Sequence, residues 1–160
     1  MLMPAISSAL VLTRQALPTL DRDTFGPSEG LEKGAYILRE ASGGEPGLII
    51  IATGSEVPLA LDAADMLEQK GINTRVVNMP SWELFDAQPD SYRQEILPPA
   101  VKARVAVEAG ISQGWHKYVG QNGAILGIEH FGASAPSKVL FEKFGITAEK
   151  VLEKALGLAG

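Results

Sequence analysis

The chain has 160 residues, of which 46% are hydrophobic and 21% charged, and a formal net charge of −5. This composition is typical of one folded domain with a core, and it excludes a disordered chain. Lysine and arginine are scattered singly, so no basic patch is present to hold a nucleic acid. Zero cysteines exclude disulfides and thiolate metal sites, and the separation of the two histidines, His116 and His130, argues against a zinc site.

Targeting signals are missing from the sequence. Residues 1–4 carry no basic head, and the apolar run at 9–12 is too short for a signal peptide. No window approaches the roughly 20 apolar residues that a membrane helix requires. We therefore expect a soluble protein without a membrane partner, and the lack of cysteine permits a cytoplasmic location.

The first predicted element is a short buried strand at residues 8–13 (SALVLT), which a loop rich in turn formers separates from the rest. Residues 1–6 resemble an arbitrary start more than a domain edge, so we interpret the chain as a cut or split piece. We expect the 8–13 strand to lie away from the main sheet or to pair with another chain, because an apolar strand edge needs a partner. Residues 34–39 (GAYILR) are predicted to form an edge strand, with a hairpin-like entry into the next unit.

The rest of the chain is expected to pack against the stretch 47–80. Residues 48–52 form an uninterrupted apolar run, and 74–77 form a second one. Both runs are typical of strands that are buried on two faces. We expect them to be parallel neighbours with a helix packed across them.

An amphipathic helix is predicted over residues 56–70, since apolar residues recur there at helical spacing and acidic residues take the opposite side. Ser55 is the expected N-cap, and Pro58 falls in the first turn, where a missing N–H costs little. Gly71 is expected to provide the left-handed stop. A strand, a helix and a strand in about 30 residues make a right-handed parallel βαβ unit of an α/β fold.

Six further elements are predicted after this unit from apolar periodicity and from turn and capping residues. They are a short helix at 90–96, a strand at 102–108, one or two helical turns at 114–119, a strand at 124–128, and helices at 137–144 and 147–156. Gly145 is expected to end the first of the last two helices, and Thr147 to cap the second.

A candidate anion site lies at Gly54, Ser55 and Glu56, where a parallel strand leads into a helix. The spacing matches neither a dinucleotide fingerprint nor a phosphate loop. Free N–H groups at the start of the helix are able to hold a small anion, and simple helix capping is the competing interpretation. Ser55 is a poor candidate nucleophile, because a nucleophile elbow requires glycine where Val57 stands.

No catalytic or metal-binding residue is assigned from residue type alone. His116 and His130 are interpreted as surface or interface residues, since no carboxylate stands at a spacing that would orient either ring. The aromatic residues are interpreted as packing anchors, with a partner interface as the alternative. They are Trp82, Phe85, Trp115, Tyr118 and Phe131.

Taken together, the segments resemble one family, and they do so in the family's order along nearly the whole chain. They are ALVLTRQALP (9–18), GAYIL (34–38), IATGSEVPLALDAADML (51–67), RVVNMPSWELFD (75–86), YRQEILPPAVKARVAVEAG (92–110), GWHKYVG (114–120), FGASAP (131–136) and FEKFGIT (141–147). This combination resembles the C-terminal region of transketolases. The TGSEV element alone also occurs in related thiamine-diphosphate enzymes, whereas the TRQ and GWHKYVG…FGASAP segments favour transketolase.

The resemblance implies a homodimeric enzyme of the pentose phosphate pathway that moves a two-carbon ketol unit between sugar phosphates. It would use thiamine diphosphate with Mg²⁺ or Ca²⁺, held by an N-terminal domain and a pyrimidine domain that this chain lacks. No cofactor is therefore expected on the chain, which is expected to be inactive alone. Arg14 matches the arginine of the family's (S/T)-R-Q segment, which binds the substrate phosphate.

The resemblance also implies a domain organisation. Residues 1–20 would be the remnant of the pyrimidine domain, 21–33 a linker, and 34–160 a three-layer α/β/α domain with a mostly parallel mixed sheet. The role of that domain in the family is unsettled, with subunit contacts and a regulatory ligand proposed. The competing hypothesis is a free-standing module that binds a small anion or a protein.

Overall fold

The computed structural model of the protein describes residues 9–158. Within these residues, five strands form one sheet in the order β1-β3-β2-β4-β5. β3, β2, β4 and β5 are parallel neighbours, and β1 pairs antiparallel with β3 at one edge, which confirms the mixed, mostly parallel sheet. The strands are β1 (Tyr36–Arg39), β2 (Leu48–Ala52), β3 (Thr74–Asn78), β4 (Arg104–Val107) and β5 (Ala124–Leu126).

The central βαβ unit forms as predicted. β2 pairs with β3 in parallel register, from Leu48 opposite Thr74 to Ala52 opposite Asn78. Helix α1 (Val57–Glu68) has Pro58 in its first turn, and Gly71 with φ 78° ends the turn that follows it. The prediction of Ser55 as N-cap is wrong. A 3₁₀ turn, η2 (Gly54–Glu56), leads into α1, and the Ser55 hydroxyl donates instead to Glu56 Oε1 at 3.1 Å.

The remaining helices agree well with the sequence. Observed are α3 (Asp90–Ile96), α4 (His116–Val119), α5 (Ser137–Phe144) and α6 (Ala148–Leu156). As predicted, Gly145 ends α5 in the left-handed conformation, and the Thr147 side chain caps α6 by accepting from the Lys150 N–H. The sequence reading missed the 3₁₀ helix η1 (Ser28–Lys33) and helix α2 (Trp82–Asp86), which the Ser81 side chain caps by accepting from the Leu84 N–H.

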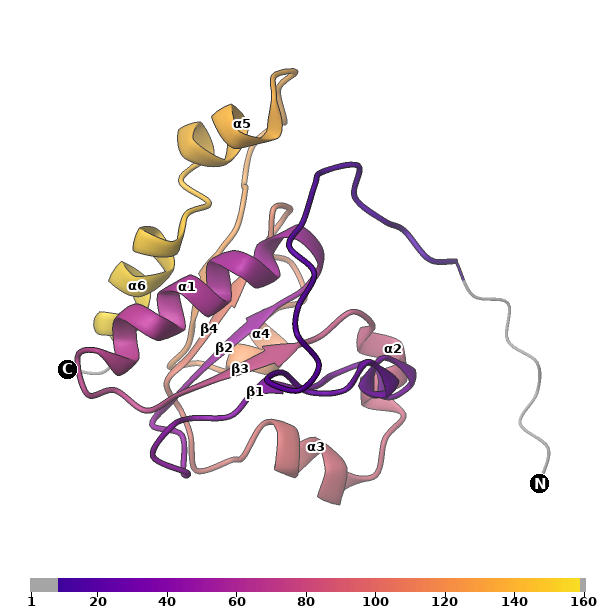
Figure 1. Ribbon diagram of the computed structural model, residues 1–160, viewed down its shortest axis with the longest axis vertical. Coiled ribbons are helices and arrows are strands. Elements are labelled where there is room, and N and C mark those ends of the chain that lie inside the picture. Colours follow the sequence, from indigo (N-terminus) through magenta and orange to yellow (C-terminus); the bar gives the residue numbers. More distant parts are fainter. Residues whose placement is uncertain (1–8, 159–160) are drawn as a thin grey trace.

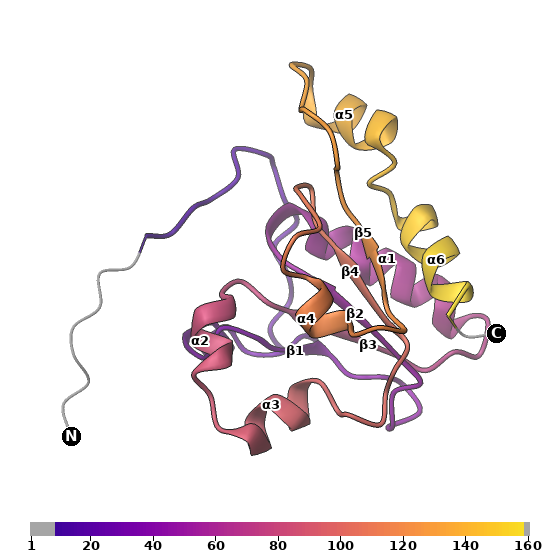
Figure 2. The same cartoon turned by 180° about the vertical axis from the view of Figure 1, so that it is seen from behind.

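The sheet is covered on both faces, so the three-layer α/β/α architecture is confirmed (Figures 1 and 2). Alternate residues of β2 point to opposite faces, and Leu48 and Ile50 pack with α1 and α6. Ile49 and Ile51 pack with residues of α2, α3 and α4. Each of these side chains is fully buried, which is worth about 1.5–3 kcal/mol apiece relative to exposure. The central strand therefore holds the two layers of helices to one sheet.

Two expectations about the first strands are corrected. β1 does not enter the unit as a hairpin with β2, because it crosses to pair with β3. Residues 9–13 form no strand and are exposed, while Ser8 lies outside the described residues. Figure 1 shows residues 9–17, here called the N-terminal arm, extending from the body of the domain. The expectation that this segment lies away from the sheet is confirmed for residues 9–13.

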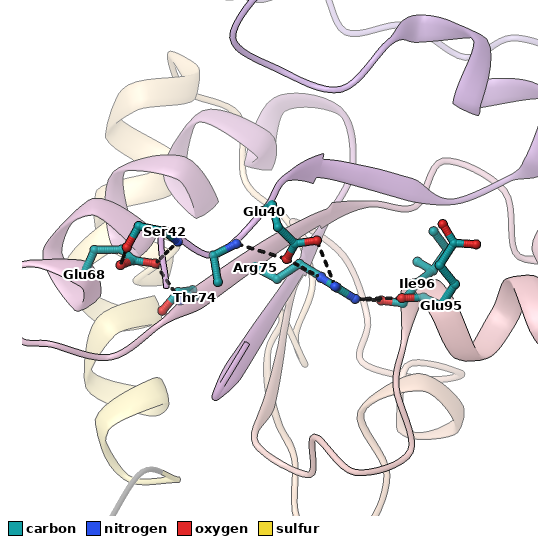
Figure 3. A network of polar contacts seen from close by, with 8 residues as sticks. Glu40, Ser42, Glu68, Thr74, Arg75, Glu95 and Ile96 are labelled. Atoms are coloured by element: carbon teal, nitrogen blue, oxygen red, sulfur yellow. Dashed lines mark hydrogen bonds and ion pairs between the residues drawn. The ribbon is translucent and has the colours of Figure 1, made fainter. Parts of the chain in front are cut away.

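A polar network ties β1 and β3 to the end of α3 (Figure 3). The Arg75 side chain is buried and donates to both Glu40 carboxylate oxygens, at 2.8 and 2.9 Å. It also donates to the backbone carbonyls of Glu95 at 2.7 Å and Ile96 at 3.2 Å. These contacts satisfy a guanidinium that would otherwise be costly to bury. Arg75 is therefore a structural residue.

Candidate functional site

The topology marks one crevice at the carboxyl ends of the strands. The chain leaves β2 and crosses through α1 to β3 on one side, then returns to β4 on the other side of β2. Neighbouring connections therefore diverge between β2 and β4, which is where open α/β sheets bind ligands. Thr53 follows β2 at this point, and Glu108 follows β4.

The first acidic group of this crevice is Glu56, whose side chain is buried although it is charged in water. Burial raises the pKa of Glu56. The opposing hydrogen bonds come from its own backbone N–H, the Ser55 hydroxyl and the Ala109 N–H, and they reduce that rise. Glu56 thus joins the start of α1 to the loop after β4.

The second acidic group is Glu108, which is partly exposed at the end of β4. Burial, and then the nearby Glu56 carboxylate, raise the pKa of Glu108 to about 7. Two carboxylates that share a crevice cannot both ionise freely. Near neutral pH this pair therefore holds a proton part of the time, so Glu108 can both donate and accept a hydrogen bond there.

Two hollows, of about 170 Å³ and about 560 Å³, open beside Glu108. Both are lined by Trp82, Glu108 and Trp115. The indole rings meet edge to face, with centroids 5.1 Å apart. Trp115 is almost fully buried, so its ring supports the wall from behind and presents little surface to a ligand.

A further hollow, of about 470 Å³, lies at the opposite end of β4 beside Arg104. The Arg104 guanidinium donates to the backbone carbonyls of Val101, Tyr118, Leu97 and Pro98, at 2.8–3.2 Å. Its donors are thus committed to the fold. This hollow therefore offers a ligand less than the carboxyl-end crevice does.

The predicted anion site at Gly54, Ser55 and Glu56 coincides with this crevice. The Glu56 carboxylate already accepts from its own backbone N–H, and Glu108 is close enough to affect it electrostatically. While both carboxyls are ionised, they repel a second anion. The anion site remains a prediction, and the geometry favours uncharged or positively charged groups at this position.

Arg14 is not brought to the crevice. It lies at an exposed bend of the N-terminal arm and does not line the hollows described above. Within residues 9–158 its side chain makes no hydrogen bond or ion pair. Its assignment to a substrate phosphate remains a prediction from the family resemblance.

The histidines are exposed, in agreement with the sequence reading, but one carboxylate had been missed. Glu129 is near enough to His116 for the charges to interact, and its carboxylate accepts from the Ser112 N–H at 3.0 Å. The His130 ring packs edge to face on Phe144, with centroids 4.7 Å apart. In the described part of the chain, no group of three His, Asp or Glu side chains is arranged to hold a metal ion.

The aromatic anchors divide into two groups. Phe85, Trp115 and Tyr118 are buried and pack as predicted, with Trp82 partly buried beside them. Phe131 is 99% exposed, so its interpretation as a packing anchor is wrong for the domain by itself. The alternative, a partner interface, remains open for Phe131.

Sequence reasoning missed Glu108, whose pKa burial and the Glu56 carboxylate raise to about 7. Its only local signal was a carboxylate at the last residue of the predicted strand at 102–108. Its partner Glu56 is distant in sequence, and the two meet because β2 and β4 lie side by side in parallel register.

None of the helices in residues 9–158 has the length and apolar character that a membrane span requires.

Comparison with known proteins gives consistent results. Residues 34–147 match the family described as Transketolase-like TK C-terminal domain. The transketolase of Aquifex aeolicus is 52% identical over 149 residues, which cover 93% of this chain and 22% of that protein. A transketolase structure from Leishmania mexicana is 50% identical with a TM-score of 0.75, covering 82% of this chain and 18% of that one. A Pichia stipitis transketolase in complex with sedoheptulose-7-phosphate is 37% identical with a TM-score of 0.80, covering 91% and 20%. The chain thus spans about a fifth of the length of these relatives.

Proposed function

The chain belongs to the transketolase family as its C-terminal domain, and we propose that it works as part of an enzyme that transfers a two-carbon ketol unit between sugar phosphates. Two findings support this proposal. About half of the aligned residues are identical to those of a transketolase, and residues 34–147 match the family of its C-terminal domain. The Pichia stipitis relative was solved with a seven-carbon ketose phosphate, which fits a phosphorylated ketose as donor. The competing hypothesis of a free-standing binding module is not favoured by family membership.

The catalytic cofactor does not fit the residues described here. The proposal assigns thiamine diphosphate and Mg²⁺ or Ca²⁺ to the complete enzyme, where the cofactor would supply the carbanion chemistry of ketol transfer. Residues 9–158 contain no metal-ligand cluster to hold the diphosphate through a cation. We assign to this chain a role in assembly and one contact to the substrate.

The proposed substrate contact is Arg14, within a proposed organisation of residues 1–20 as the end of the preceding pyrimidine domain, 21–33 as linker and 34–160 as the C-terminal domain. The planar guanidinium can donate two charge-assisted hydrogen bonds to phosphate oxygens. Its exposure and lack of an internal partner in the described residues leave it available for such a role. The partners would be the N-terminal and pyrimidine domains, and the complete enzyme would be a homodimer in the cytoplasm.

The test is a hybrid enzyme in which this chain replaces the segment of the Aquifex aeolicus transketolase with which it aligns. We expect thiamine-diphosphate-dependent and Mg²⁺-dependent ketol transfer from a ketose phosphate to an aldose phosphate. The same transketolase truncated before that segment is the control. A hybrid enzyme that folds and dimerises but has no activity above this control would contradict the proposal. Calorimetry on the chain alone is expected to show no binding of thiamine diphosphate in the presence of Mg²⁺.

A further inference from the structure

The chain contains three asparagines, Asn73, Asn78 and Asn122, and only the last is followed by glycine. An asparagine side chain can react with the peptide group that follows it, because the next backbone nitrogen can attack the side-chain carbonyl carbon and displace ammonia. Two conditions favour this attack. The following residue must not crowd the nitrogen, which glycine satisfies best, and no strong hydrogen bond may hold the N–H. The three sites differ in both conditions.

Asn122 is exposed in the turn between α4 and β5. A backbone hydrogen bond closes this turn, from the Gly123 N–H to the Gly120 carbonyl, at 3.4 Å. This distance is longer than the usual range of about 2.7–3.2 Å, so the bond is weak. The nitrogen that would attack the Asn122 side chain is therefore only loosely held, and water reaches the residue.

Asn73 and Asn78 stand at the two ends of β3, and both are partly buried. The N–H after Asn73 donates to the Glu68 carboxylate at 2.7 Å, and the N–H after Asn78 donates to the Ala52 carbonyl at 2.9 Å. The residue after Asn73 is the β-branched Thr74, which also crowds the attacking nitrogen. Both asparagines are therefore protected by the sheet, whereas Asn122 is not.

The glycine that makes Asn122 reactive is required by packing. A Cβ atom at Gly123 would lie 2.5 Å from the Val119 side chain and 2.8 Å from the backbone carbonyl oxygen of Arg104. Both contacts are far too short, and the backbone oxygen cannot move aside as the tip of a flexible side chain can. Any larger residue would strain the start of β5, so the fold itself keeps glycine next to Asn122.

We propose that Asn122 is a site of spontaneous deamidation in the folded protein, and that the hollow beside Arg104 accommodates the carboxylate that results. The Gly123 nitrogen gives its proton to the solvent and attacks Asn122 Cγ, so that a succinimide ring forms and the side-chain nitrogen leaves as ammonia. Water then opens the ring. Cleavage between the nitrogen and Cγ gives aspartate with the original main chain, and cleavage between the nitrogen and the main-chain carbonyl carbon gives isoaspartate.

The net reaction consumes one water and releases one ammonia, and both come from or go to the solvent. The inference concerns the chain itself and does not depend on the proposed function.

The charges of the hollow favour the product. Among the described residues that line it, none is acidic, and Lys102 and Arg104 are basic. Asn122 lines the same hollow, so a carboxylate at position 122 is attracted to these cations, and the aspartate form should keep the fold. The isoaspartate form lengthens the main chain directly before Gly123, where no space is spare, and should weaken the start of β5.

Tryptic digestion separates the three asparagines, because they fall in peptides 71–75, 76–93 and 118–138. The folded chain is incubated in mildly alkaline buffer, and digested samples are analysed by mass spectrometry, which detects the change from amide to acid. Fragment ions distinguish Asn122 from the neighbouring Gln121. The same incubation of the chain unfolded in guanidinium chloride measures the rate at each asparagine without the structure.

We expect peptide 118–138 of the folded chain to be converted at least about tenfold faster than either other peptide, because a held N–H must first break its hydrogen bond and open the strand. Chromatography should resolve the aspartate and isoaspartate products. Asn122→Gln should stop the conversion, since the longer side chain closes a ring much more slowly.

Two results would overturn the proposal. One is equal conversion of all three asparagines in the folded chain. The other is a rate at Asn122 that is about a hundredfold or more lower in the folded chain than in the unfolded chain, because the turn would then protect the site.

Asn122→Asp tests the second half of the proposal, because it represents the aspartate product. Its midpoint of urea unfolding should equal that of the wild type or be higher. A clear fall in the midpoint would overturn the statement that the hollow accommodates the carboxylate.

Discussion

Substituting Glu108 by glutamine tests the electrostatics of the carboxyl-end crevice. Burial and the Glu56 carboxylate raise the pKa of Glu108 from 4.5 to about 7, so the folded protein holds this proton more tightly than the unfolded chain. Stability from this group is complete below pH 4.5 and is lost as the pH rises through about 7. A pKa difference of about 2.5, at about 1.36 kcal/mol each, sets an upper limit of about 3.4 kcal/mol. Because Glu108 is partly exposed and water screens its charge, we expect about 1–2 kcal/mol.

The assay is urea unfolding of the isolated chain at pH 5 and pH 8, with the free energy of unfolding extrapolated to water. Glu108→Gln has no proton to lose, so it should match the wild type at pH 5 and exceed it by about 1–2 kcal/mol at pH 8. Glu32→Gln, at an exposed position of η1, serves as the control and should match the wild type at both pH values. If Glu108→Gln is no more stable than the wild type at pH 8, burial and the Glu56 carboxylate do not raise the pKa of Glu108.

Three further outcomes are expected. Arg75→Met leaves the Glu40 carboxylate and two backbone carbonyls without their donor, and should lower the free energy of unfolding by about 2–3 kcal/mol. A loss below about 0.5 kcal/mol would mean that these hydrogen bonds do not stabilise the fold. Burial opposes the charge of Glu68, but hydrogen bonds to its carboxylate outweigh this effect and lower its pKa, so the stability that Glu68 contributes is lost as the pH falls below 4.5. Glu68→Gln should therefore lose less of its melting temperature than the wild type when the pH is lowered through this range. An equal fall of the melting temperature in both proteins would contradict this role of Glu68. In the hybrid enzyme, Arg14→Ala should reduce kcat/KM for phosphorylated acceptors by roughly ten- to a hundredfold while sparing glycolaldehyde, and equal losses on both acceptors would mean that Arg14 is structural.

The sequence predicted the elements that depend on neighbouring residues. The apolar runs of β2 and β3, the helical periodicity of α1 and the turn at Gly71 are local features, so the βαβ unit could be read directly. The Thr147 cap and the glycine that ends α5 are equally local, and both were predicted.

The errors concern contacts between distant segments. Ser55 is a good N-cap by residue type, but the Glu56 carboxylate accepts hydrogen bonds from the Ser55 hydroxyl and from the Ala109 N–H. The chain therefore enters α1 through a 3₁₀ turn and without a side-chain cap from Ser55. β1 pairs with β3 because strand order is decided by the whole sheet, and no short pattern encodes it. Phe131 was interpreted as a packing anchor from its type, although the domain by itself leaves it in solvent.

The charges at the carboxyl end of the sheet bear on where the substrate phosphate binds. In many α/β proteins the crevice after the strands receives the ligand, and the start of a helix favours an anion there. Here that position is taken by Glu56 and Glu108, which repel a sugar phosphate whenever both are ionised. The proposed phosphate ligand, Arg14, lies instead in the arm that leads away from the sheet. An acidic crevice is poorly suited to bind a sugar phosphate, which is why we place the substrate contact at Arg14 in the arm.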